Sequence, residues 1–333
     1  MPGFTPRHHS VAFLLLALLP LAAAGQSTAP ITPAVTEAKE TIDPGAELRE
    51  EADAKQLEEI VRDQAALFAD LEQNPESQRL PQAEKERRIS DLARRYEAYL
   101  IRRPKDVDAL LLYGKFLRLV DMREEANKRF EEADKLWPNQ AVIKHQLGAY
   151  AAEEGNYVTA LTLLEQATRL APKTAVYHYH FGEFLATYQN ILSSRNLLKR
   201  EECDKKMQEA FHTAAELNPD EAGYRWRYAE SFFDCEKPNW RLALAAWNSL
   251  AAEARSPLEK EVLGLYRARV HAELGQKSEA ETLLGASKSP QLESTREEIR
   301  NILRPPVTVP TAPPIPTPTA TVPATPTPTA STK

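Results

Sequence analysis

The middle of the chain repeats a pattern of apolar and small residues every 34 positions. Gly114, Gly148 and Gly182 have this spacing, and an apolar or aromatic residue precedes each of them. A second stretch within each period contains, in this order, an alanine, a large apolar residue, another alanine, a leucine and a proline. Apolar positions three and four apart predict helices, two for each period. The matched pairs are Ala126 and Ala160, Phe130 and Leu164, Ala133 and Ala167, Leu136 and Leu170, and Pro138 and Pro172.

The small residues of this pattern have a packing role. A side chain in place of any of the three repeat glycines would push two crossing helices apart and leave a void. Ala126 and Ala160 are small because a neighbouring helix packs on them. Gly155 is expected to end a first helix because it tolerates positive φ. Pro138 and Pro172 are expected to stop the second helices.

This pattern resembles the tetratricopeptide repeat (TPR), a pair of antiparallel helices that stacks into a superhelix. The resemblance implies an all-α fold, a right-handed α-solenoid of antiparallel helix pairs, between disordered N- and C-terminal segments. About five units, the last degenerate, fill residues 107–285. The second helix of the third unit matches only after 13 extra residues. That insert, near residues 189–203, either lengthens both helices or adds a short turn. Residues 286–304 predict a capping helix.

The segments around the repeats differ in composition. Residues 46–104 carry two apolar stripes at helical spacing, which predict a helical hairpin or a further, diverged unit. Pro75 and Pro81 break the hairpin, and Pro104 ends it. Residues 25–45 have no apolar period and are interpreted as a disordered linker. Residues 305–333 form a Pro/Thr-rich tail, expected to be disordered and extended.

The first 24 residues predict a secretory signal peptide. Arg7 precedes the apolar run VAFLLLALLPLAA, and Ala22, Ala23 and Ala24 supply a small-residue cleavage site. The apolar run of about 14 residues is shorter than the ~20 that span a bilayer, which favours cleavage over a membrane anchor. No later run is long enough to span. We therefore expect an exported protein of a bacterial periplasm or cell envelope, or an extracellular one.

Charge and motifs narrow the class of function. The net charge of the 333 residues is −6 with both signs interleaved, so nucleic acid and anionic membranes are not the expected partners. We find no phosphate-binding glycine loop, zinc-ligand spacing or glycine-flanked serine nucleophile. The sequence therefore predicts a non-enzymatic protein without cofactor or metal. The enzymatic alternative places a substrate cleft around Glu183, Glu230 and His180.

The TPR resemblance also implies a binding site. In such proteins the first helix of each unit lines a concave groove that holds an extended peptide or a partner helix. Tyr, Trp and Arg, which dominate interface energies, occur at these positions; the alternative is that the aromatic side chains pack between units. Chaperone-binding members hold a terminal carboxylate with Lys, Asn and Arg side chains, whereas the matching positions here are Ala149, Glu183 and Glu230. The predicted binding residues are Lys115, His145, Gln146, Tyr179, His180, Glu183, Trp226, Arg227 and Glu230, with Leu111, Leu112 and Ala149 beside them.

The two cysteines suggest a covalent link. Export would bring Cys203 and Cys235 into an oxidising space, and the repeat register puts both at the same edge of adjacent units. A disulfide between the third and fourth units is the resulting hypothesis, and two buried thiols are the alternative. His178 and His180 are two residues apart on a helix and point to different faces, which disfavours a shared metal. The histidines are instead expected to line the groove or to lie in the core.

Taken together, these features predict an exported TPR scaffold or adaptor that binds a protein or extended peptide of unknown identity in its groove. The alternative is a structural spacer of the cell envelope, attached through the Pro/Thr-rich tail. Loss of localisation on deleting the tail would favour the spacer.

Overall fold

The structure is a computed structural model that describes residues 46–304. The predicted signal peptide, linker and Pro/Thr-rich tail lie outside the described residues. The described part is helical and contains no β-strand, which confirms the all-α fold class. It divides into two compact units, the first ending at Arg255 and the second beginning at Ser256. The predicted solenoid, residues 107–285, crosses this division.

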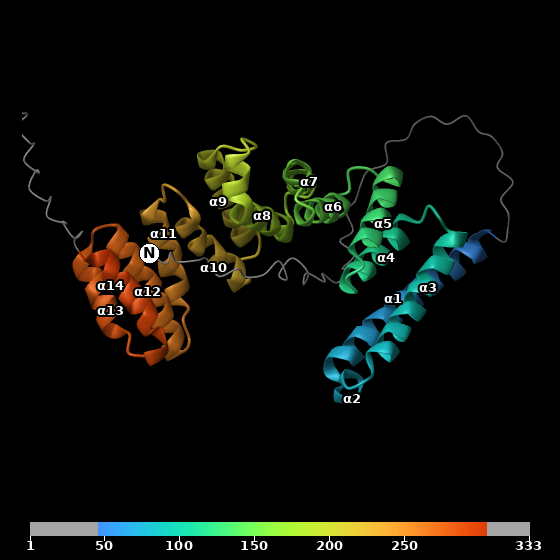
Figure 1. Ribbon diagram of the computed structural model, residues 1–333, viewed down its shortest axis with the longest axis horizontal. Helices are drawn as coiled ribbons and strands as arrows, with labels where there is room; N and C mark the ends of the chain where they lie inside the picture. The colour runs from blue at the N-terminus through green and yellow to red at the C-terminus, as the bar shows by residue number, and fades with distance from the viewer. Residues whose placement is uncertain (1–45, 305–333) are drawn as a thin grey trace, which may run out of the picture. The chain divides into compact units, whose positions relative to one another are not determined.

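The first unit consists of consecutive helices joined by short loops (Figure 1). A long hairpin comes first, and four helix pairs follow. The bounds are α1 Ala46–Gln73, α2 Pro75–Gln78, α3 Gln82–Arg102, α4 Val107–Leu119, α5 Arg123–Leu136, α6 Ala141–Glu153, α7 Tyr157–Leu170, α8 Ala175–Ser194, α9 Arg200–Leu217, α10 Ala222–Ser231, the 3₁₀ turn η2 Phe232–Asp234, and α11 Trp240–Ala252.

The hairpin packs directly on the first repeat. Helices α1 and α3 lie side by side (Figure 1), with Ile60 and Tyr96 fully buried. The Tyr96 ring stacks on the Tyr113 ring of α4, with 5.1 Å between centroids. The Tyr99 hydroxyl donates a 2.6 Å hydrogen bond to Asp106, the residue that caps the N-terminus of α4. The hairpin thus covers the open end of the repeat array.

The three repeat glycines lie at helix crossings, as predicted. Each is on the first helix of its pair and faces a large apolar side chain of the second. An added Cβ would come closer than 3.0 Å to that side chain, a separation that packed carbon atoms do not tolerate. The closest approach would be 2.6 Å to Phe130 at Gly114, 2.9 Å to Leu164 at Gly148, and 2.8 Å to Phe211 at Gly182.

One type of turn joins the two helices of four pairs. A residue with positive φ follows the first helix, and the next amide donates to the carbonyl five residues earlier. In the second repeat, Asn156 N donates to Ala151 O at 2.8 Å. This arrangement satisfies carbonyls that the helix end leaves free. The positive-φ residues are Asp121 (62°), Gly155 (74°), Asn196 (55°) and Gly275 (74°).

The insert lengthens both helices of the third repeat. Helix α8 has 20 residues and α9 has 18, whereas α6 and α7 have 13 and 14. Leu192 near the end of α8 and Leu198 before α9 are buried in the same apolar cluster as Phe181 and Phe211, so the added turns extend the core of the repeats.

The second unit is a small helical cluster. Ser256 begins α12 with a capping box shared with Glu259. Leu265 and Ala268 of α12 pack with Leu284 of α13 and Ile299 of α14. The last helix therefore packs on the preceding pair through Ile299. The bounds are α12 Pro257–Glu273, α13 Lys277–Ala286, the 3₁₀ turn η3 Pro290–Leu292, and α14 Glu293–Leu303.

Candidate binding face

The predicted binding residues lie on the first helices of four consecutive pairs, α4, α6, α8 and α10. We call the side of these helices that carries them the first-helix face. Two of the nine residues, His145 and His180, are buried, and the other seven are half-buried: Lys115, Gln146, Tyr179, Glu183, Trp226, Arg227 and Glu230.

The two histidines are interior residues rather than open groove positions. His145 is 6% exposed and His180 is 5% exposed. His145 Nε2 lies 2.7 Å from His180 Nδ1, and the rings stack with 4.8 Å between centroids. Burial, and then the neighbouring His180, lowers the pKa of His145 well below its usual range. Burial lowers the pKa of His180 to about 4. The pair links α6 to α8, which agrees with the core alternative for these histidines.

Arg227 is the centre of a charged cluster that joins the third and fourth repeats. Its Nε atom lies 2.6 Å from Glu183 Oε1 of α8, and its Nη1 atom lies 2.9 Å from Asp234 Oδ2 of η2. The guanidinium also lies over the Phe211 ring, 4.4 Å from the centroid. Glu230 Oε2 is 4.0 Å from Nη1. Three predicted residues, Glu183, Arg227 and Glu230, therefore come together, and Asp234 joins them from a 3₁₀ turn that the periodicity did not predict.

The aromatic residues of the face pack against other rings. Tyr179 lies 5.9 Å from Phe211 and 4.9 Å from Tyr224 between centroids. Trp226 meets Trp247 of α11 edge to face at 5.0 Å. Burial raises the pKa of Tyr179. Tyr179 therefore packs both within its own pair and against the next one, Trp226 packs within the fourth pair, and both residues stay half-buried.

Lys115 differs from the other charged groups of the face. It is half-buried on α4, and desolvation lowers its pKa. Within residues 46–304 it has neither a hydrogen bond nor an ion pair. One turn further along α4, Arg118 forms two bonds of 2.8 and 2.7 Å to Glu153 of α6. Lys115 is thus a partly desolvated cation without a counter-charge in the described chain.

The cysteines occupy the predicted helix ends but are thiols in the structure, which differs from the predicted disulfide. Cys203 lies in the first turn of α9, and Cys235 follows η2. The sulfur of Cys203 faces Leu185 O of α8 at 3.8 Å, and that of Cys235 faces Ser231 O at 3.5 Å. Each sulfur is thus directed at a backbone carbonyl, and both pack in one apolar cluster.

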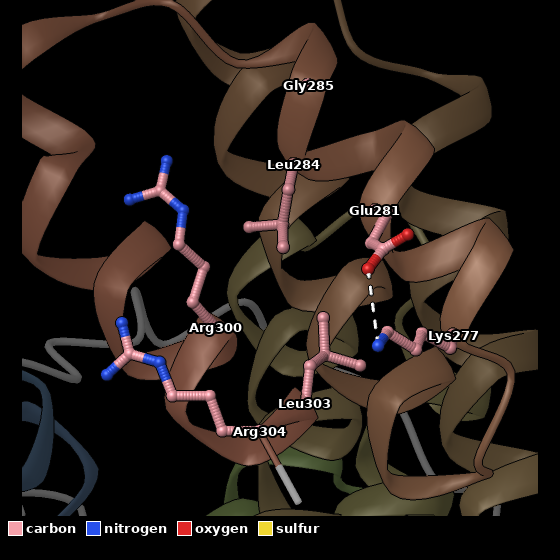
Figure 2. A pocket seen from close by; sticks show the side chains of 7 residues that line it. All are labelled: Lys277, Glu281, Leu284, Gly285, Arg300, Leu303 and Arg304. Atoms are coloured by element: carbon pink, nitrogen blue, oxygen red, sulfur yellow. Dashed lines mark ion pairs between the residues drawn. The ribbon is translucent and has the colours of Figure 1, made fainter.

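The second unit has a hollow of about 470 Å³ between α13 and α14 (Figure 2). Leu284 and Leu303 line it, and charged side chains surround it. Each of its three cations already has a carboxylate partner, so the hollow offers no unpaired charge to a ligand. The pairs are Lys277 with Glu281 at 3.7 Å, Arg300 with Glu293 at 2.8 Å, and Arg304 with Glu297 at 2.8 Å.

Two further properties concern residues 46–304 only. None of the helices in that range combines the length and the apolarity needed to cross a membrane. No group of three or more His, Cys, Asp or Glu side chains in the same range is arranged to hold a metal ion.

The crossing glycines, the 34-residue period and the shared turn together decide the type of repeat. The helix pairs have the architecture of the tetratricopeptide repeat. This TPR architecture extends from α4 to α11, with a longer third unit. No known family model matches the sequence, and no curated protein matches it either.

Several solved TPR-like structures resemble the chain at low identity. A structure of PilF from Pseudomonas aeruginosa has 12% identity and a TM-score of 0.48, covering 75% of this chain and 99% of that one. YrrB, described as a TPR protein with an unusual peptide-binding site, has 14% identity and a TM-score of 0.47, covering 62% and 92%. MamA from Desulfovibrio magneticus has 20% identity and a TM-score of 0.41, covering 59% and 92%. Such low values say nothing about what this chain binds.

Proposed function

We propose that the protein is a non-catalytic scaffold that binds a segment of another protein along the first-helix face. The observation that carries this proposal is the row of half-buried side chains on α4, α6, α8 and α10. These side chains recur at the same register of each unit, so an extended partner would meet an equivalent position at every step. Tyr179, Trp226 and Arg227 add the residue types that contribute most to interface energies.

The face is held in place before a partner arrives. The glycine crossings fix the first three helix pairs, and the His145–His180 and Arg227–Glu183 contacts fix successive first helices against each other. A preformed surface loses less conformational entropy on binding than a flexible one. The mechanism is therefore presentation of a rigid, side-chain-lined surface, with no chemical step.

We further propose that the scaffold works outside the cytoplasm, in the periplasm or cell envelope. The support is the apolar run and small-residue site within residues 1–24. Fractionation of the native host and N-terminal sequencing of the mature chain would test it. A chain that keeps Met1 and stays in the cytoplasm would contradict export without affecting the binding proposal.

Site-specific photocrosslinking would test the binding face. A crosslinking residue at Gln146, which is half-buried on α6, should capture a partner in the native host. The control is Thr162, an exposed residue on α7, the second helix of the same pair. Capture at position 146 and not at 162 supports the proposal. Equal capture at both positions, or capture at 162 only, overturns it.

A further inference from the structure

Two successive joints of the first-helix face carry the same pair of rings. At the joint between the second and third repeats, His145 of α6 lies 5.2 Å from Tyr177 of α8 between ring centroids, with a tilt of 40°. At the next joint, Tyr179 of α8 lies 4.9 Å from Tyr224 of α10, with a tilt of 35°. The two pairs are equivalent in register, because 34 residues separate their first members and 47, which is 34 plus the 13 inserted residues, separate their second members.

The tyrosines of these ring pairs have hydrogen-bonding capacity that the described chain does not use. Tyr177, Tyr179 and Tyr224 are half-buried, and none of their hydroxyl groups has a hydrogen bond within residues 46–304. A tyrosine hydroxyl is a donor as well as an acceptor, and burial keeps His145 uncharged by lowering its pKa. The ring pairs therefore offer apolar ring surfaces and hydroxyl donors, without a charge.

The spacing of the ring pairs fits one kind of backbone. Helices in direct side-chain contact lie about 8–10 Å apart, so equivalent ring pairs recur at about that distance. A polyproline II helix has three residues per turn and rises 3.1 Å per residue, or about 9 Å per turn. A segment with a proline at every third residue would therefore bring one proline to each ring pair. Its carbonyl groups have no partners within the helix and would accept hydrogen bonds from the tyrosine hydroxyls.

The chain itself contains a segment with this proline spacing, outside the described residues. Residues 305–333 hold ten prolines, and Lys333 is the only charged residue among them. Pro310, Pro313 and Pro316 follow one another at intervals of three. In a polyproline II helix they would lie on one side, about 9 Å apart. This segment has the spacing and the lack of charge that the ring pairs require.

We infer that the Pro/Thr-rich segment of residues 305–333 is a ligand of the two ring pairs, bound as a polyproline II helix with prolines three residues apart against successive pairs. This inference rests on the proposed function, because the ring pairs belong to the first-helix face. It adds that the protein carries its own ligand for that face, which competes with a partner protein for the same side chains.

Photocrosslinking in the purified full chain would test the inference. A photoreactive phenylalanine derivative at position 224 should form a crosslink to residues 305–333, which mass spectrometry would identify. The control position is Tyr150, which is half-buried on α6 but belongs to neither ring pair. A crosslink from position 224 and not from 150 supports the inference. No crosslink to residues 305–333 from position 224, or equal yields from both positions, overturns it.

Two triple variants of the full chain would test the proline spacing. Replacing Pro310, Pro313 and Pro316 by Ala should remove the crosslink from position 224. The matched control replaces Pro306, Pro318 and Pro328 by Ala, because none of these has a proline three residues away, and it should keep the crosslink. An equal or larger loss in the control variant overturns the inference.

Salt separates recognition by rings from recognition by charge. In about 1 M NaCl the Debye length is only about 3 Å, and the crosslink from position 224 should persist because the ring pairs carry no charge to screen. Its loss at this salt concentration overturns the inference. If position 224 gives no crosslink to residues 305–333 and crosslinking at Gln146 still captures a partner, the proposed function stands and this inference fails.

Discussion

The Nε2 atom of His145 lies 2.7 Å from the Nδ1 atom of His180, across the joint between the second and third repeats. The bond requires one nitrogen to donate and the other to accept, so at least one ring must be neutral. His180, Arg118 and Lys115 all disfavour a positive charge on His145. The joint between these repeats is therefore built for two uncharged imidazoles.

We expect the free energy of unfolding to decrease as the pH falls from about 6.5 to about 4. The folded-state pKa of His180 is lowered to about 4, and that of His145 is also lowered. The unfolded chain therefore takes up more protons in this window. The contribution of the pair is complete above the ordinary histidine pKa of about 6.5 and is lost progressively below it. Chemical denaturation at a series of pH values would measure the slope.

Two histidine variants would show whether the slope comes from this pair or from other titrating groups. His180→Gln should flatten the slope, because one titrating group is removed. His212→Gln is the control, since His212 is on α9 with a side chain 48% exposed. It should keep the slope of the unaltered protein. A slope that is the same in all three proteins would show that the histidine pair does not control it.

Gly148→Ala should destabilise the first unit. The new Cβ would lie 2.9 Å from Leu164 Cγ and 3.1 Å from Leu164 N, and the backbone atom cannot turn away. Overpacking of this kind costs about 1–3 kcal/mol, which exceeds the gain in helix propensity of about 1 kcal/mol. Urea denaturation followed by circular dichroism would measure the difference.

Gly264→Ala provides the comparison. Gly264 is also inside a helix, α12, but an added Cβ meets nothing within 4 Å. We expect no loss, or a gain of up to about 1 kcal/mol from helix propensity. Destabilisation of the same size at both glycines would mean that the crossing contact is not the cause.

The repeat geometry was predictable because close backbone contact restricts side-chain size at a fixed period. Gly114 faces Phe130 and Gly148 faces Leu164, so both glycines lie where the two helices of one unit cross, as the 34-residue pattern predicts. The position of Gly155 at positive φ followed from the same pattern. In these cases a constraint on the backbone restricts the residue types that the position can hold, and the sequence shows this restriction directly.

The contacts of the first-helix face were not predictable in the same way. The 34-residue register aligns His145 with Tyr179, whereas the structure pairs it with His180, one residue out of register. Such a pairing depends on how two helices are tilted and rotated relative to each other. The 34-residue period contains no information about this tilt and rotation. The division after Arg255 likewise cuts through a sequence pattern that continues into the degenerate fifth unit.

Arg227→Ala should destabilise the chain by about 2 kcal/mol, because it leaves Glu183 and Asp234 without their cation in a partly desolvated site. The variant also removes the guanidinium from the Phe211 ring. Arg225→Ala is the control on the same helix, since the partner of Arg225, Glu253, is 58% exposed. An exposed pair contributes at most about 1 kcal/mol. Equal losses in thermal denaturation would contradict a central role for Arg227.

The thiols of Cys203 and Cys235 should react slowly in the folded protein. Burial raises the pKa of Cys203 to about 11 and that of Cys235 to about 12, and the thiolate is the form that reacts with alkylating reagents. In denaturant without reductant, two alkyl groups should be added, because the structure contains two thiols.

Mass spectrometry of protein purified from its native host would decide between these thiols and the disulfide predicted from the sequence. The control is the same alkylation after reduction, which gives the maximum uptake. Uptake of two groups only after reduction would establish the disulfide.

The two sulfurs would then have to leave the carbonyls of Leu185 and Ser231 and turn toward each other, because a disulfide requires a sulfur–sulfur separation of about 2 Å. A Cys235→Ser variant, which keeps a hydrogen-bond donor near Ser231 O, would then lose the stability that the link adds; with free thiols it should unfold nearly as the unaltered chain does.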